Sequence, residues 1–235
     1  MQLSDRLEKI VSLIDAGNRL LDVGCDHGYL AIEAVRRGIV PRAICSDVRK
    51  GPLDRAKAHV AEAGLTDKIK LRLTDGLDGL VPDEAETLVI AGMGGMLMMS
   101  ILEKAFQDPG NGIHGLRQMV LEPQSDLPSF REMIDRTSFR IRDEFLVLDR
   151  GKYYFIFDLC PGEKEETKGQ DPFFSLPLLQ RRDPVYRDYL EKEYRKNQDI
   201  IRKLTDESTV TALNRCQALK EENKKIREVI DKCYR

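Results

Sequence analysis

The residues best suited to chemistry follow a short apolar run near the N-terminus. The run 19–23 leads into Gly24, and the turn continues through Asp26 to Gly28. A strand that enters a glycine turn and then a helix brings the backbone close to a ligand at the carboxyl edge of a parallel sheet. The spacing predicts a nucleotide-like ligand here, although an ordinary tight turn would use the same two glycines.

Asp26 bears on which ligand this is. Dinucleotide-binding turns place their second glycine at this point, so that the backbone can touch a pyrophosphate. A carboxylate there repels a diphosphate and attracts a cation, such as the ammonium group of a methionine moiety. S-adenosylmethionine carries that ammonium and a sulfonium, and it has no phosphate. Asp26 therefore favours S-adenosylmethionine over NAD.

Two more carboxylates end the next expected strands. Asp47 lies 25 residues after Asp22, and Asp75 follows the run 68–73. A carboxylate at the first position accepts hydrogen bonds from ribose hydroxyls, and one at the second can accept from an adenine amino group. Asp47 could also cap the helix that follows it.

The fourth and fifth expected strands end in Gly92–Gly95 and Glu122–Gln124. Gly92–Gly95 leaves room for a flat group near the methyl donor, and Glu122 and Gln124 offer an acceptor and an amide. Close helix–strand packing would also explain the glycines, and a helix N-terminal turn would explain the second segment.

These residues depend on alternating strands and helices. The expected strands are 19–23, 42–46, 68–73, 87–91, 117–121, 139–149 and 152–159. The expected helices are 3–15, 28–37, 51–63, 95–106 and 126–137. The alternation predicts an α/β fold with a mostly parallel, Rossmann-like sheet, in which the tight turn at Arg150-Gly151 reverses one strand.

The composition changes after residue 160. We expect a cofactor-binding domain over 1–160, a linker over 161–177 and an α-helical, coiled-coil-like hairpin over 178–235 with a turn near 206–208. The expected apolar stripe is Tyr186, Leu190, Tyr194, Asn197, Ile201 and Leu204, then Val210, Leu213, Leu219, Ile226 and Ile230.

Bulk properties narrow the class of protein. No apolar run approaches the roughly 20 residues that span a bilayer, and no signal peptide is visible at the N-terminus. The five cysteines form no CxxC pair and the three histidines are scattered, so neither a metal site nor a disulfide framework is expected. We expect a cytoplasmic protein, and the sequence leaves its oligomeric state open between monomer and weak dimer.

Taken together, the motifs resemble the bacterial tRNA (adenine-22-N1)-methyltransferase family. They are Asp22–Leu30, Asp47 with Gly51–Leu53, Asp75–Leu77, Ile90–Gly95 and Leu121–Gln124. The resemblance covers about 1–160 strongly, and the hairpin matches in kind. Family members more often carry Ser at Cys25 and Ala at Gly28. The resemblance implies a class I methyltransferase fold, S-adenosylmethionine as methyl donor and tRNA as substrate.

The resemblance also implies site residues. The cofactor contacts would be Asp22, Gly24, Cys25, Asp26, His27, Gly28, Tyr29, Asp47, Val48, Asp75, Gly76, Leu77, Gly92 and Met93. The residues near the reacting atoms would be Asp26, Gly94, Glu122, Pro123 and Gln124. Adenine N1 has its own lone pair, so the chemistry needs positioning more than a strong base. Nearby carboxylates, Asp26 and Glu122, would stabilise the cationic product as it forms. His27 would line the cofactor site or act as an acid or base.

The hairpin would then grip tRNA. Residues 178–235 carry 15 lysines and arginines against 11 aspartates and glutamates, within a chain of net charge −2. The expected contacts to the phosphate backbone are Arg181, Arg182, Arg187, Lys192, Arg195, Lys196, Arg202 and Lys203. A solvated helical face would carry the same interleaved charges. Two other functions stay open: a methylase of another RNA, a protein or a small molecule, and a non-catalytic RNA-binding protein.

Overall fold

The computed structural model describes residues 3–163, 171–204 and 209–234. The chain forms two compact units, Met1–Phe174 and Ser175–Arg235. Their boundary falls within the segment expected to be a linker, of which 164–170 lies outside the described residues. The expected hairpin turn at 206–208 also lies outside them.

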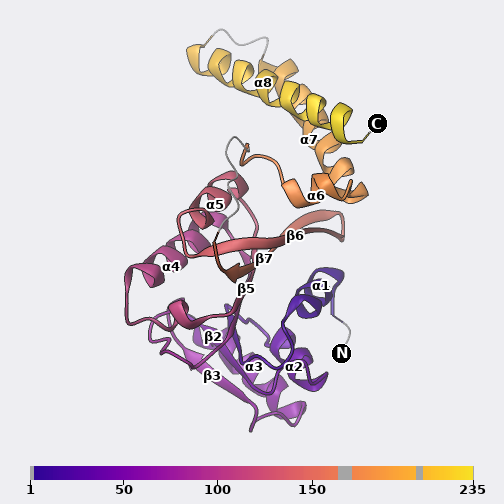
Figure 1. Ribbon diagram of the computed structural model, residues 1–235. Coiled ribbons are helices and arrows are strands. Elements are labelled where there is room, and N and C mark those ends of the chain that lie inside the picture. Colours follow the sequence, from indigo (N-terminus) through magenta and orange to yellow (C-terminus); the bar gives the residue numbers. More distant parts are fainter. Residues whose placement is uncertain (1–2, 164–170, 205–208, 235) are drawn as a thin grey trace. The chain divides into compact units, whose positions relative to one another are not determined.

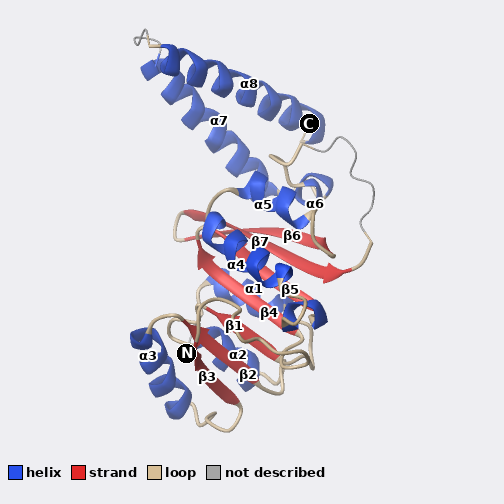
Figure 2. Ribbon diagram, turned by 90° about the vertical axis from the view of Figure 1, so that its left-hand side faces the viewer, coloured by secondary structure: helices blue, strands red, loops and turns tan. Residues whose placement is uncertain are grey.

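A seven-stranded sheet in the order β3-β2-β1-β4-β5-β7-β6 forms the first unit (Figure 2). Its strands are β1 (Leu20–Val23), β2 (Ala43–Asp47), β3 (Ile69–Leu73), β4 (Thr87–Met93), β5 (Gln118–Pro123), β6 (Phe139–Asp149) and β7 (Lys152–Pro161). β7 runs antiparallel to β5 and β6, whereas β1 to β5 pair in parallel. The predicted α/β fold with one reversed strand is confirmed.

Helices cover both faces of this sheet. They are α1 (Asp5–Leu13), α2 (Tyr29–Arg36), α3 (Lys50–Glu62), α4 (Gly95–Gln107) and α5 (Leu127–Ile134), with a 3₁₀ turn at Gly112–Gly115. α2 contacts α1 and α3, and α4 contacts α5. In Figure 1, α4 and α5 lie on the opposite side of β5 and β7 from α1. Two covered faces explain why β1, β2 and β5 are buried along their whole length.

The strand order creates a switch point beside β1. β1 pairs with β2 on one side and with β4 on the other, and Val23 lies opposite both Ser46 and Ile90. The chain leaves these three strands at the same edge, which is where doubly wound sheets bind ligands. The glycine turn, Asp47 and Gly92 therefore meet, as the strand-end argument predicts.

The second unit holds α6 (Leu176–Gln180), α7 (Pro184–Leu204) and α8 (Val210–Cys233). The Asn197 side chain of α7 donates to Glu222 of α8 over 2.7 Å, and Asn223 donates to the carbonyl of Tyr194 over 3.2 Å. Residue numbers fall along one helix as they rise along the other, so the pair is antiparallel, as predicted.

The predicted stripe on α8 is wrong at its start. Val210 and Leu213 are 73% and 58% exposed, while Ala212 and Cys216 are buried instead. Counting back from the buried Leu219 by three and seven residues reaches Cys216 and Ala212. The helical phase therefore selects two small residues over two larger apolar ones.

Candidate functional site

A cleft of about 750 Å³ opens at the carboxyl ends of β1, β2 and β4. Its volume falls in the range of small-molecule sites. The predicted residues that line it are Asp22, Gly24, Cys25, Asp26, His27, Tyr29, Asp47, Val48, Asp75, Gly76, Gly92, Met93 and Gln124. Side chains that sequence reasoning did not select also line it, among them Arg6, Arg49, Arg55, Leu97 and Ile101.

Five predicted residues lie beside the cleft and do not line it: Gly28, Leu77, Gly94, Glu122 and Pro123. Gly28 starts α2, and a Cβ there would lie 3.3 Å from Ala56 of α3, so this glycine allows two helices to approach. Leu77 is buried and lines a small neighbouring hollow of about 130 Å³. Gly94 precedes the first turn of α4, and Pro123 is buried at the end of β5.

The turn after β1 depends on glycine conformation. Gly24 has φ +72°, and its N–H donates to the carbonyl of Ser46 on β2 over 2.8 Å. A Cβ at Gly24 would meet the terminal methyl of the flexible Met93 side chain. The positive φ also strains any other residue at this position, which is why the turn needs glycine. Asp26 also has positive φ, +46°, and it lines the cleft.

Asp22 forms the polar floor of the cleft. It is buried, and its Oδ2 atom has no hydrogen-bond partner within the described part of the chain. Burial, with a smaller contribution from the nearby Asp47 charge, raises the pKa of Asp22 to about 7. A buried carboxylate oxygen without a partner, facing an open cleft, is suited to a cationic ligand group.

The Asp26 side chain is more exposed than that of Asp22, and it is already paired with a cationic side chain. Its Oδ1 accepts from Arg55 over 2.9 Å, and its Oδ2 lies 3.5 Å from Nε2 of His27. The rings of His27, Tyr29 and His59 stack on one another at 4.8–5.5 Å between centroids. The stacked rings pack beside the turn, and Arg55 offsets the negative charge of Asp26.

The two carboxylates expected at the nucleoside end have different surroundings. Asp47 is buried, and its Oδ1 accepts from the backbone N–H of Arg49 over 2.8 Å, which fixes its orientation. Asp75 is exposed at the rim. Val48 is 61% exposed between the two ends of the cleft, where an apolar surface could lie against a flat ring.

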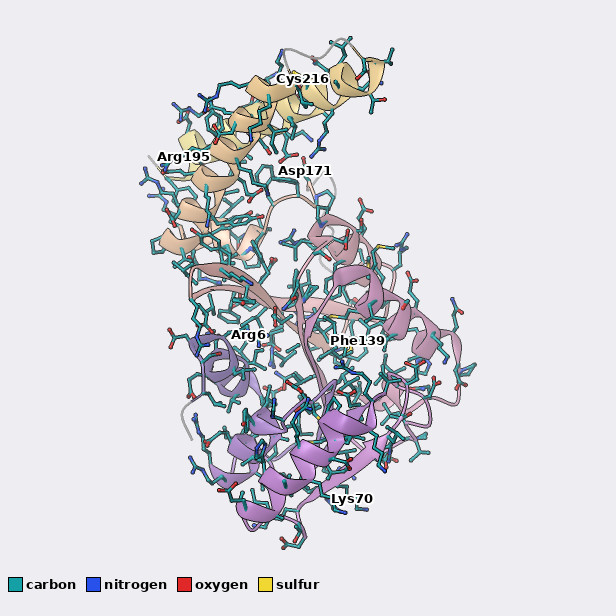
Figure 3. The ribbon with its side chains drawn as sticks, turned by 180° about the vertical axis from the view of Figure 1, so that it is seen from behind. Arg6, Lys70, Phe139, Asp171, Arg195 and Cys216 are labelled. Atoms are coloured by element: carbon teal, nitrogen blue, oxygen red, sulfur yellow. The ribbon has the colours of Figure 1, made fainter. Side chains whose placement is uncertain are left out.

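Beside the cleft, Glu122 is fully buried and forms an ion pair with Arg6 of α1. Arg6 is labelled in Figure 3. The N–H of Gly92 donates to the same oxygen, Oε2, over 2.9 Å, while Oε1 has no partner among the described residues. Burial raises the pKa of Glu122, and Arg6 and the Gly92 N–H oppose that rise. Like Asp26, Glu122 therefore carries its own counter-charge.

Arg6 is the principal residue that the sequence reasoning missed. Its guanidinium also lies over the ring of Tyr154, 5.0 Å from the centroid. The sequence does contain an indication that Arg6 is special. Arg6 lies three residues after Leu3 and four before Ile10, which places it on the apolar face of α1. A charge on that face predicts a buried partner.

The cations predicted to bind nucleic acid are largely paired within α7. Arg187 and Arg195 both bond Glu191, Lys196 bonds Glu193, and Arg202 bonds Asp199. Arg181 and Arg182 lie just before α7 and are exposed. A groove of about 760 Å³ between α7 and α8 adds other cations; it is lined by Tyr194, Gln198, Ile201, Arg202, Lys220, Asn223, Lys224, Arg227, Glu228 and Asp231.

Membrane spans and metal-binding clusters are both absent from the described residues. No helix there combines the length and apolar character needed to cross a membrane. No group of three or more histidine, cysteine, aspartate or glutamate side chains there is arranged to hold a metal ion.

Comparison with known proteins gives the family. A family described as a methyltransferase domain matches residues 3–157. The tRNA (adenine(22)-N(1))-methyltransferase of Bacillus subtilis is 32% identical over 165 residues, which are 70% of this chain and 68% of that protein.

Solved structures match the chain almost from end to end. A putative tRNA (m1A22) methyltransferase of Streptococcus pneumoniae, in complex with S-adenosyl-L-methionine, is 31% identical with a TM-score of 0.85, covering 97% of this chain and 100% of that one. The crystal structure of the B. subtilis m1A22 tRNA methyltransferase is 27% identical with a TM-score of 0.83, covering 97% and 99%. The chain belongs to the tRNA (adenine(22)-N(1))-methyltransferase family.

Proposed function

We propose that this protein transfers a methyl group from S-adenosylmethionine to N1 of adenine 22 in tRNA. The observation that carries the proposal is the cleft at the β1 switch point, in a chain that shares its fold with the family over nearly its full length. The cleft combines a buried, unpartnered Asp22 oxygen with a side-chain-free turn at Gly24.

The residues present fit S-adenosylmethionine. Asp22, with Asp26 at the mouth, would hold the ammonium, Asp47 the ribose hydroxyls and Asp75 the adenine amino group. Asp22 is the better placed for the ammonium, because Arg55 already balances Asp26. When bound, S-adenosylmethionine supplies an activated methyl group on a sulfonium.

The protein's own contribution is positioning and exclusion of water. Gly92 at the end of β4 leaves space beside Arg6 and Gln124, where the target base would enter. Adenine N1 attacks through its lone pair, so no side chain has to remove a proton first. The base becomes cationic as the bond forms. The Glu122 carboxylate would stabilise that positive charge, and the ion pair with Arg6 offsets part of its effect.

The target base must leave its stack in tRNA to reach this depth. Met96 and Leu97, in the first turn of α4, are 64% and 56% exposed, and Leu97 also lines the cleft. They offer apolar contact to the displaced base or its neighbours. The second unit would hold the rest of the tRNA through phosphate contacts. We propose that the enzyme acts in the cytoplasm, together with its tRNA substrate.

The test is methylation of unmodified tRNA followed by mapping. Purified protein, S-adenosylmethionine and tRNA from a strain without this modification should give one 1-methyladenosine, at position 22, by mass spectrometry of nuclease fragments. Asp22→Asn should reduce the rate by at least tenfold. Methylation of another nucleotide, or of protein alone, would refute the proposal.

A further inference from the structure

Two polar side chains, those of Gln124 and Arg6, lie close to Gly92, and the proposed function gives neither of them a contact with the substrate. Gln124 follows Pro123 at the end of β5, and its backbone N–H donates to the carbonyl of Met93 over 2.9 Å. Its exposed side chain lines the cleft. A Cβ added to Gly92 would lie 3.8 Å from Nε2 of Gln124 and 3.5 Å from Nη1 of Arg6, so both side chains border the space above this glycine.

The chemistry of the reaction limits how adenine can be recognised. N1 must stay free to face the methyl donor, so the protein cannot use the Watson–Crick edge at N1 for binding. The groups left for hydrogen bonds are the N6 amino group, N7 and N3, and of these N6 and N7 lie side by side on one edge of the base. A glutamine amide matches this pair, with its carbonyl accepting from N6 and its NH₂ donating to N7.

From this geometry we infer that Gln124 is the specificity-determining residue, reading the N6 and N7 atoms of the target adenine. The inference rests on the proposed function and adds how the base is chosen. Guanine presents two acceptors, O6 and N7, on the same edge, so one end of the amide would always oppose an acceptor.

Arg6 acts here as a positioning residue. A free arginine would suit guanine, because its fork matches O6 and N7. Glu122 already accepts from Nη1 of Arg6, and the ring of Tyr154 lies against the guanidinium. These contacts hold Arg6 as a wall of the base site and withdraw it from guanine recognition.

The test removes the proposed hydrogen bond between Gln124 and N7 in two ways: by changing the base in the tRNA and by changing Gln124 in the enzyme. Wild-type enzyme should methylate tRNA with 7-deazaadenosine at position 22 about tenfold or more less efficiently, in kcat/KM, than tRNA with adenosine, because N7 is lost. Gln124→Leu should lower kcat/KM for normal tRNA by a similar factor and lose little more with 7-deazaadenosine. Gln124→Glu keeps the acceptor for N6 but turns a second acceptor toward N7. Its kcat/KM on normal tRNA should lie below that of the wild type, and 7-deazaadenosine should not lower it further.

Controls separate this inference from folding and from the proposed function. Gln107→Leu, at the exposed end of α4, should behave as wild type, and calorimetry should give Gln124→Leu an unchanged Kd for S-adenosylmethionine. If Gln124→Leu fails to fold, the 7-deazaadenosine comparison with wild-type enzyme still decides. Equal rates on both tRNAs, or losses that multiply in the variant, would overturn the inference. Absence of methylation at adenine 22 by wild-type enzyme would instead overturn the proposed function.

Discussion

The ionisation of Asp22 makes the stability of the protein depend on pH. An aspartate in an unfolded chain has a pKa of 3.8, and burial raises the pKa of Asp22 in the folded protein to about 7. Between these values the folded state binds more protons than the unfolded chain, so the free energy of unfolding falls as pH rises. The loss amounts to roughly 1.4 kcal/mol per pKa unit and is complete above about pH 7.

This predicts a distinct behaviour of Asp22→Asn. Without cofactor, the variant should lack that fall and be more stable than wild type at pH 8, by about 1–4 kcal/mol, while the two match more closely at pH 5. Urea denaturation at several pH values measures the difference. Parallel stability curves for the two proteins would show that Asp22 stays ionised in the free enzyme.

The Arg6–Glu122 pair makes a second prediction at this scale. Arg6→Met leaves a buried carboxylate without its counter-charge and should cost about 3–5 kcal/mol of unfolding free energy. Adding Glu122→Gln should restore most of it, since the amide oxygen can still accept from Gly92. Arg49→Met, which removes a largely exposed arginine from the same cleft, serves as control and should change stability by about 0.5 kcal/mol or less.

At the scale of elements, the position of α4 depends on its first residue, Gly95. A Cβ there would overlap the backbone carbonyl of Ser125 and lie 2.9 Å from its carbon. Gly95→Ala should therefore cost about 1–3 kcal/mol, visible as a lower Tm. Gly115→Ala meets nothing within 4 Å and should leave Tm unchanged. Equal Tm values for the two variants would show that α4 can shift freely.

Patterns in the sequence predict most of these elements, because strands at 20–23 and 87–93 are apolar runs that end in glycine turns. The partners of Asp26 and Glu122 could not be read in this way. Arg55 and Arg6 come from helices 29 and 116 residues away in sequence, and only the packing of those helices against the sheet brings the charges together. The pattern of apolar and polar residues identifies a strand or a helix, but it does not show which side chain forms an ion pair with a residue of another element.

At the scale of the whole molecule, the charge of the second unit bears on tRNA binding. The groove between α7 and α8 carries Lys220 and Lys224, both exposed. Reversing both to glutamate should weaken tRNA binding about tenfold and flatten its salt dependence by roughly two units of log–log slope. Binding of S-adenosylmethionine should not change.

The matched control reverses Lys57 and Lys68 on the first unit, which are also exposed. Filter binding across a series of salt concentrations compares the two proteins. Equal weakening would mean that tRNA responds to total charge alone. Unchanged binding in both would make the charges of α7 and α8 a solvated surface, as their pairing within α7 also allows.

The ion pair between Arg6 and Glu122 has a consequence for biosynthesis. Its two members lie 116 residues apart, and a chain leaves the ribosome from its N-terminus. α1 is therefore complete long before β5 exists, and Arg6 reaches its partner only after the sheet has grown past β4. The turn from Asp22 to Asp47 depends on chain that has already emerged. In each newly made molecule, the residues proposed to bind the methyl donor are thus synthesised before Gln124, the residue proposed to read the base.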